Sequence, residues 1–488
     1  MSETIRGLSL LTSCGCNLKC EYCRIAQSVN SGSAQLQQNT IQALQDGTYR
    51  ENVKQVLLNL HQSPASIEGI AFWGQEPTLT LHHISAHLEE WFELFPNWTQ
   101  TMFSTNCVAH MDRIVEFCDR VEECSKNPFS LQIQLSYDGD YSTNNLRGAS
   151  SSVIHDNIHY LISELNKRNY KKLAVRFNHH GVLSMDLLSK LQSTDAIIEY
   201  ATKLYQWGEE FYQLGSNKRV ELIPDVDLGL ENPVEATPED GMRLAYFCEL
   251  CDRIGIDPYV DIAQYHPVPM PPSVQLYAAF NGTFDNIAHF LRNEHQIDNL
   301  DIGLDIMMQD TRLFKDFCNA MNPSMYCGNG VGELKIMWDG TLINCQNHIY
   351  ETDVSLLPTD NSVINATKRT LATHGYFINP LKDDKELVDK YFHLFSTVKF
   401  NSFEFIYKSI VTLMHFLAET GQIHESYRDP RKVWKHGLII AMQNACSYNS
   451  QIMTGSIFLK HTGFIRLYCN GYLDRAIMHY NSREGGIF

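Results

Sequence analysis

Apolar and polar positions alternate with two different periods along the first half of the chain. Short apolar runs typical of buried strands lie between longer stretches in which apolar residues recur every three to four positions, which predicts helices. The predicted strands are residues 5–11, 69–73, 101–106, 131–137, 173–179 and 220–224. The predicted helices are residues 36–61, 81–95, 111–124, 152–167, 185–212 and 238–254.

This alternation predicts an α/β fold in which parallel strands are joined by helical, right-handed crossovers. We expect the strands to form a partial (β/α)6 barrel over residues 1–240. A proline-rich bridging segment is expected over 241–317, and a small β-hairpin region, turning at Asp339-Gly340, over 318–370. The remaining residues, 371–488, are predicted to be mostly helical, most clearly over 403–419 and 431–448.

Composition and charge narrow the class of protein. The chain has 488 residues, and its 44% hydrophobic and 19% charged content is typical of a globular protein. A formal net charge of −17 argues against a large nucleic-acid footprint, which needs a basic surface. The N-terminus lacks a signal-peptide pattern, and no apolar run approaches the roughly 20 residues of a membrane span. We expect a cytoplasmic protein with no membrane partner, since its cysteines cluster in motifs rather than forming a secreted framework.

Three cysteines follow the first predicted strand in a Cys-x3-Cys-x2-Cys spacing. Cys16, Cys20 and Cys23 can aim three thiolates from one tight loop at three corners of a 4Fe-4S cluster. Such clusters normally take four cysteines, so a loop that offers three indicates an iron left open for a substrate or cofactor. An alternative is a four-cysteine zinc site that also includes Cys14.

Other polar residues fall where the predicted parallel strands end. The carboxyl ends of such strands meet at one edge of a sheet, where the chemistry of barrel folds gathers. We therefore expect these residues to lie together with the cysteine loop. They are Gly74, Gln75 and Glu76 after the second strand, Asn106 after the third, Ser136 and Asp138 after the fourth, and Arg176 at the end of the fifth.

Together these motifs resemble the radical S-adenosylmethionine superfamily. The loop CNLKCEYC matches its cysteine motif, with Tyr22 as the aromatic residue, and Gly74-Gln-Glu-Pro77 resembles its Gly-Gly-Glu-Pro segment. The resemblance implies that Glu76 accepts a hydrogen bond from the methionyl ammonium. It also implies that Ser136 and Asp138 face the ribose and that Arg147 pairs with the methionyl carboxylate. Gln75 departs from the pattern, because the family usually has a second glycine there.

A second cysteine region resembles the opening of the extensions called SPASM and twitch, which hold auxiliary iron–sulfur clusters. The predicted hairpin would bring Cys345 close to Cys327, but the later cysteines of the full SPASM pattern are missing. We therefore expect one auxiliary cluster at most, with Cys327 and Cys345 as its firm ligands. Further candidate ligands are Cys318, Cys446 and Cys469. A remnant of the extension that holds no cluster is the alternative.

The resemblance implies an oxidoreductase-type enzyme that cleaves S-adenosylmethionine to a 5′-deoxyadenosyl radical. That radical would abstract hydrogen from a peptide or protein substrate, as in the maturases of ribosomally made peptides. Reduced flavodoxin or ferredoxin would supply the electron. One alternative is a related enzyme that oxidises or rearranges a small molecule such as an aminosugar, and another is a non-catalytic zinc-binding scaffold. No residue is assigned a catalytic role from the sequence.

Overall fold

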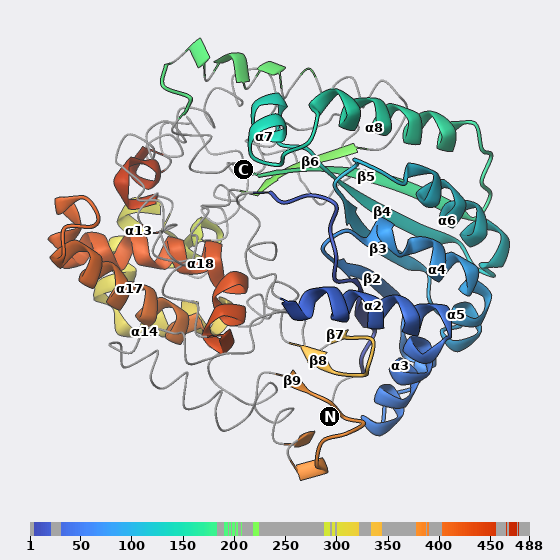
Figure 1. The fold of residues 1–488 in the computed structure, drawn as a ribbon. Coiled ribbons are helices and arrows are strands. Elements are labelled where there is room, and N and C mark those ends of the chain that lie inside the picture. The colour runs from blue at the N-terminus through green and yellow to red at the C-terminus, as the bar shows by residue number, and fades with distance from the viewer. Residues whose placement is uncertain are drawn as a thin grey trace.

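The computed structural model shows a mixed α/β protein in which a twisted sheet is flanked by helices (Figure 1). The residues it describes are 4–20, 31–182, 218–223, 300–321, 333–343, 377–386, 388–389 and 403–454, with parts of 190–206, 287–297 and 465–477. The nine described strands lie in the order β6-β5-β4-β3-β2-β1-β7-β8-β9. Their bounds are β1 Gly7–Ser13, β2 Gly69–Gly74, β3 Gln100–Thr105, β4 Phe129–Ser136, β5 Leu173–Val182, β6 Lys218–Ile223, β7 Glu333–Ile336, β8 Leu342–Ile343 and β9 Phe377–Ile378.

Strands β1 to β6 are all parallel, as the sequence predicts, and each of the six predicted strands is present. Helices of the crossovers pack on the outer face of the sheet (Figure 1). The described helices are α2 Ser31–Gln45, α3 Thr48–Asn59, α4 Leu81–Ala86, α5 Leu88–Leu94, α6 Met111–Cys124, α7 Asp140–Asn145, α8 Ser151–Asn166, α13 Leu300–Gln309, α14 Thr311–Met321, α17 Phe403–Glu419 and α18 Pro430–Thr454.

Strand β4 shows why one edge of this sheet can hold a polar site. Its residues alternate between buried and half-buried, so Phe129, Leu131, Ile133 and Leu135 face the core under the helices. The intervening residues are polar and share the opposite face, where Gln132 pairs in register with Arg176 of β5. Parallel sheets are usually apolar on both faces. A polar second face therefore indicates a hydrated or ligand-binding interior.

Two long predicted helices are each interrupted. The predicted helix 36–61 breaks at Gly47, whose φ of 79° lies in the left-handed region, and becomes α2 and α3. The predicted helix 81–95 breaks at His87 into α4 and α5. The predicted helix 185–212 lies mostly outside the described residues, and 238–254 lies wholly outside them.

The C-terminal half of the chain contributes a separate group of helices, α13, α14, α17 and α18, which pack on one another beside the sheet (Figure 1). Helices α17 and α18 lie where the sequence predicts helices, whereas α13 and α14 were not predicted. The expected boundary between 317 and 318 falls inside α14, and the boundaries at 240 and 370 lie in stretches that the structure does not describe.

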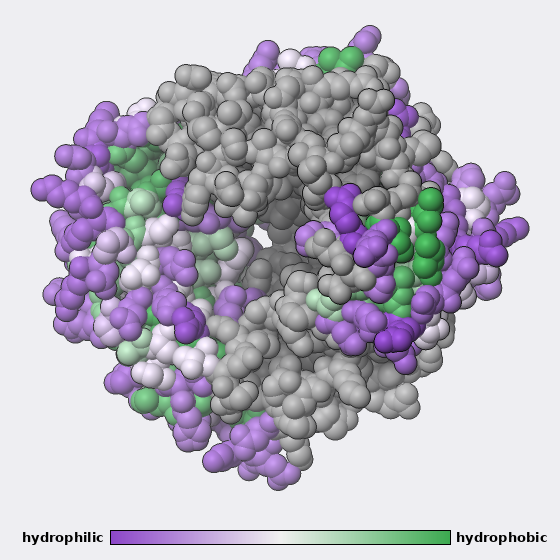
Figure 2. Space-filling view, turned by 180° about the vertical axis from the view of Figure 1, so that it is seen from behind, coloured by the Kyte–Doolittle hydropathy of each residue, from purple (hydrophilic) through white to green (hydrophobic). Residues whose placement is uncertain are grey.

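Polar side chains cover most of the described surface in Figure 2, and apolar ones interrupt it in small groups. On the helical group, the large apolar side chains with exposed surface are Ile302, Ile306, Phe416 and Trp434. None of the helices that the structure describes is both long and apolar enough to span a bilayer.

The predicted hairpin around Asp339-Gly340 is present, but it extends the main sheet. Strand β7 pairs in parallel with β1, and β8 turns back against β7 through Gly340, whose φ is 86°. Helix α3 holds this extension through side chains that donate to its backbone carbonyls. These bonds run from Tyr49 Oη to Ile336 O at 2.7 Å, from Asn52 Nδ2 to Trp338 O at 2.9 Å and from Asn59 Nδ2 to Pro380 O at 3.0 Å.

Replacing Tyr49 by Phe should lower the free energy of unfolding by about 1 kcal/mol, because Ile336 O loses a buried donor. Urea unfolding measures the change, and Tyr160→Phe on the exposed part of α8 is the matched control, expected to change nothing. Equal stability of the Tyr49 variant and the wild type would contradict a role for this bond.

Candidate functional site

The cysteine loop leaves strand β1 at the carboxyl edge of the sheet. Cys14 turns into the core, where its Sγ lies 3.7 Å from Thr40 Oγ1 and burial raises the pKa of its thiol to about 11. Cys16 and Cys20 are half-buried and remain accessible. Tyr22 and Cys23 lie outside the described residues. The loop thus separates one core cysteine from two that can reach a ligand.

The segment after β2 is tied to the backbone that leads into this loop. Gly74 has a φ of 133°, and a Cβ atom there would lie 1.8 Å from Ser13 O. The next two amides donate to the first strand's extension, Gln75 N to Ser13 O at 3.0 Å and Glu76 N to Gly15 O at 3.1 Å. The half-buried Gln75 therefore contributes its backbone to the junction. Only glycine at position 74 allows the two segments to approach this closely.

Gly74→Ala should therefore separate the two segments. The left-handed backbone and the clash with Ser13 O together should cost roughly 3 kcal/mol of unfolding free energy. Thermal and urea unfolding measure the loss. Ala in place of Gly148, which also has a positive φ but meets nothing within 4 Å, is the control for backbone strain alone and should cost about 1 kcal/mol. Equal costs for the two variants would show that the close approach is unimportant.

Glu76 is a deeply buried charged group at this edge, with 1% of its surface exposed. Its carboxylate accepts hydrogen bonds from Thr78 Oγ1 at 2.6 Å, Thr78 N at 3.3 Å and Asn106 N at 2.7 Å. Burial raises the pKa of Glu76, and these hydrogen bonds oppose the shift only in part. Among the described residues, no lysine or arginine forms an ion pair with Glu76. This carboxyl group is thus buried and hydrogen-bonded, with no cationic partner among the described residues.

Asn106 joins the glutamate to the cysteine loop. Its backbone N–H donates to Glu76, and its side-chain Nδ2 donates to Asn17 Oδ1 at 2.7 Å and approaches Cys16 Sγ at 3.6 Å. Three segments that are far apart in the sequence therefore meet at one point. The sequence motifs include Glu76, Asn106 and Cys16, whereas the parts played by Thr78 and Asn17 become apparent only from their hydrogen bonds.

Asp138 and Arg147 form a buried ion pair beside this point. Arg147 Nε donates to Asp138 Oδ2 at 2.5 Å and Arg147 Nη2 to Asp138 Oδ1 at 2.8 Å, and both residues are at most 6% exposed. The family resemblance implies a separate cofactor contact for each residue, whereas in the structure they contact each other. Two planar groups joined by two parallel bonds hold each other's orientation firmly.

Ser136 and Arg176 lie on the polar face of the sheet. Ser136 ends β4 and is half-buried, opposite His180 of β5 in the register. Arg176 lies further from the edge, opposite Gln132, and is also half-buried. Both residues thus line the same interior face that ends at Asp138.

The proposed auxiliary cysteines have different surroundings. Cys318 on α14 is buried beside Glu404 and Lys408 of α17, and burial raises the pKa of its thiol to about 12. Cys469 is buried beside Tyr427. Cys446 lies on α18, and its side chain is not among those the structure describes. Cys327 and Cys345 lie outside the described residues. The residues that the structure does describe contain no group of three His, Cys, Asp or Glu placed to hold a metal ion.

No protein-family model matches this chain, and no curated protein matches it either.

Proposed function

We propose that this chain is a radical S-adenosylmethionine enzyme whose parallel strands form a partial (β/α)6 barrel. The observation that carries the proposal is the junction at Asn106, which contacts both the Glu76 carboxylate and the Cys16 thiol. One S-adenosylmethionine molecule would have to reach both the cluster and the carboxylate that binds its ammonium group. The cysteine loop and Glu76 would therefore have to be adjacent. Asn106 makes them adjacent.

The residues present fit the group that the proposal requires. Cys16 and Cys20 are accessible, and with Cys23 they would hold three irons of a 4Fe-4S cluster. The buried carboxyl group of Glu76 could pair with a cation, because no described ion pair already neutralises it. Burial raises its pKa, so a bound cation would stabilise the ionised form. The ammonium of S-adenosylmethionine would supply that cation and gain a charge-assisted hydrogen bond.

When bound, the cluster and S-adenosylmethionine together supply one-electron reductive cleavage to a 5′-deoxyadenosyl radical. The chain's own residues bind and orient. Glu76 would fix the amino group, and Thr78 and Asn106 would fix Glu76. Arg147 donates hydrogen bonds from Nε and Nη2 to Asp138, so we propose that it positions the Asp138 carboxylate toward the ribose. Arg147 would contact the methionyl carboxylate only while it stays paired with Asp138. Ser136 and Arg176 would line the reaction chamber, and the closed core beneath them would exclude water.

We propose that the substrate is a peptide or protein, and that a reduced flavodoxin or ferredoxin delivers the electron. The second candidate is a small-molecule substrate, which a closed polar chamber would favour. The position of Cys14 argues against a four-cysteine zinc scaffold, because the Cys14 side chain is buried against Thr40 and faces away from solvent. An auxiliary cluster on Cys327 and Cys345 remains part of the proposal.

The test is iron, sulfide and zinc content after anaerobic purification, followed by reduction with dithionite in the presence of S-adenosylmethionine and assay of 5′-deoxyadenosine. We expect about four irons per chain, or about eight with the auxiliary cluster, and cleavage in either case. The triple variant Cys16→Ala, Cys20→Ala and Cys23→Ala should lose about four irons and all cleavage, whereas Cys14→Ala should keep both. Zinc without iron, together with no cleavage, would overturn the proposal.

A further inference from the structure

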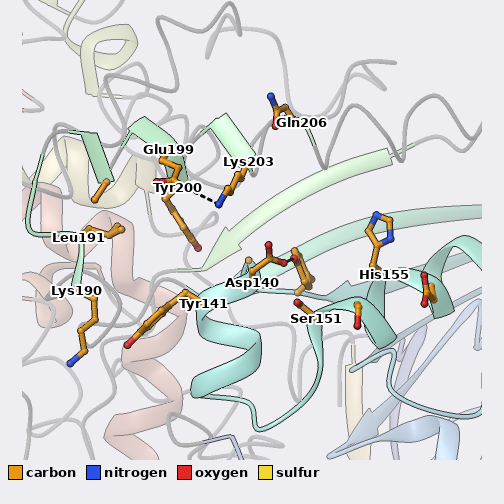
Figure 3. Close-up of a pocket in the computed structure, with 15 residues that line it drawn as sticks. Asp140, Tyr141, Ser151, His155, Lys190, Leu191, Glu199, Tyr200, Lys203 and Gln206 are labelled. Atoms are coloured by element: carbon orange, nitrogen blue, oxygen red, sulfur yellow. Dashed lines mark hydrogen bonds and ion pairs between the residues drawn. The ribbon is translucent and has the colours of Figure 1, made fainter.

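A cleft beside Asp138 is not used by the proposed chemistry. It has a volume of about 690 Å3 and lies between the start of α7 and α8 on one side and the segment 190–206 on the other (Figure 3). This volume is within the range of sites that bind small molecules or side chains. Many of its lining residues are exposed, including Asp140, Tyr141 and Glu199, so the cleft opens broadly to solvent.

Tyr200 separates the cleft from the cofactor-binding residues. Its hydroxyl donates to the backbone carbonyl of Asp138 at 2.7 Å, while the Asp138 carboxylate is turned to Arg147. Gly139 lets the ring pack there, because its φ is 83° and a Cβ would lie 2.9 Å from Tyr200 Cε2. Tyr200 is therefore fixed as a wall that the cleft shares with the neighbourhood of Asp138.

The walls combine aromatic rings with carboxylates. Tyr137, Tyr141 and Tyr200 line the cleft, as do the carboxylates of Asp140, Asp156 and Glu199 and the ammonium groups of Lys190 and Lys203. Lys203 and Glu199 neutralise each other at 2.7 Å, which is the contact dashed in Figure 3. Figure 3 also shows Lys190 at one end of the cleft, extending away from Tyr200. With Lys203 paired to Glu199, the charged side chains that remain are Asp140, Asp156 and Lys190, which sum to a net charge of −1, and Asp140 also accepts a hydrogen bond from Tyr137 Oη.

We propose that this cleft is a docking site for a lysine or arginine side chain of a peptide, held between the tyrosine rings and next to Asp140 and Asp156. An aromatic face attracts a cation, and a nearby carboxylate adds to the attraction. The net charge of −17 would also steer a basic peptide toward the protein. The open mouth suits a chain that continues beyond the anchored residue. This inference rests on the proposed function only in naming the docked peptide as the substrate.

Binding can be measured without cofactor or turnover, so its failure is distinguishable from failure of the proposed chemistry. The probes are fluorescein-labelled Gly/Ser peptides of about ten residues with a central lysine, arginine or norleucine, followed by fluorescence anisotropy at about 0.15 M salt. We expect the lysine and arginine peptides to bind about tenfold more tightly than the norleucine peptide. Equal affinity for lysine and norleucine would overturn the proposal, as would a free diamine that binds as tightly as the lysine peptide.

The variants Asp156→Asn and Tyr141→Leu act on exposed side chains, so neither threatens folding. Each should weaken the lysine peptide about fivefold and leave the norleucine peptide unchanged. The control is the double variant Glu93→Gln and Glu116→Gln, which removes two exposed carboxylates away from the cleft and so makes the net charge less negative by two. An equal loss in the control would mean that overall charge alone attracts the peptide, and the docking site would be wrong.

Discussion

Replacing Glu76 by Gln is expected to weaken S-adenosylmethionine binding by about a hundredfold while leaving the iron content unchanged. The substitution removes the buried negative charge that we propose holds the ammonium. It also turns an amide N–H2 toward donors, because Thr78 and Asn106 N–H already point at the carboxylate. Equilibrium binding and 5′-deoxyadenosine formation measure the loss.

The matched control for this variant is Glu93→Gln, on an exposed part of α5. It should bind and cleave like the wild type. Loss of iron in Glu76→Gln would show that Glu76 supports the cysteine loop through Asn106 and not the cofactor. Unchanged binding with full cleavage would remove Glu76 from the proposed site.

The pH dependence of stability, compared between the wild type and Glu76→Gln, tests whether the carboxyl group of Glu76 is buried. Folding raises the pKa of the Glu76 carboxyl, so the folded chain holds this proton more tightly than the unfolded chain does. The resulting stability is complete below the ordinary glutamate pKa of about 4.3 and is lost as pH rises through the raised value. The unfolding free energy of the apo wild type, minus that of Glu76→Gln, should therefore fall as pH rises above about 4 and through the raised pKa of Glu76. A difference that rises with pH would contradict this.

Much of the sheet could be predicted because each strand has a local signal. In β4 every second residue from Phe129 to Leu135 is apolar and buried, which is a pattern that a sequence displays directly. The break at Gly47 and the start of α14 also had local signals. Asp310 Oδ1 accepts from Arg312 N at 2.8 Å and Leu313 N at 3.2 Å, which is a readable helix cap.

The rest depends on contacts between distant segments. Strand β7 pairs with β1, and Ser9 is hydrogen-bonded to Glu333. Neither stretch of sequence contains a signal that identifies the other as its partner strand. The ion pair of Asp138 with Arg147 also could not be predicted from the sequence. Both residues were recognised as charged groups near the site, but a sequence cannot say whether two opposite charges meet a ligand or meet each other.

Breaking the Asp138–Arg147 pair from one side should be costly. Either Asp138→Leu or Arg147→Met leaves a single buried charge, which should lower the unfolding free energy by roughly 3–5 kcal/mol. The double variant removes both charges and should recover most of this loss, to within about 1–2 kcal/mol of the wild type. Urea unfolding of the apoproteins gives the four values of the cycle.

The double variant also separates folding from function. If the pair positions Asp138 for the cofactor, the double variant should fold and keep its iron yet lose 5′-deoxyadenosine formation by about a hundredfold. Cleavage at the wild-type rate would assign the pair to the core alone. Single-variant losses that simply add in the double variant would show that the two charges do not interact, contrary to the 2.5 and 2.8 Å bonds between them.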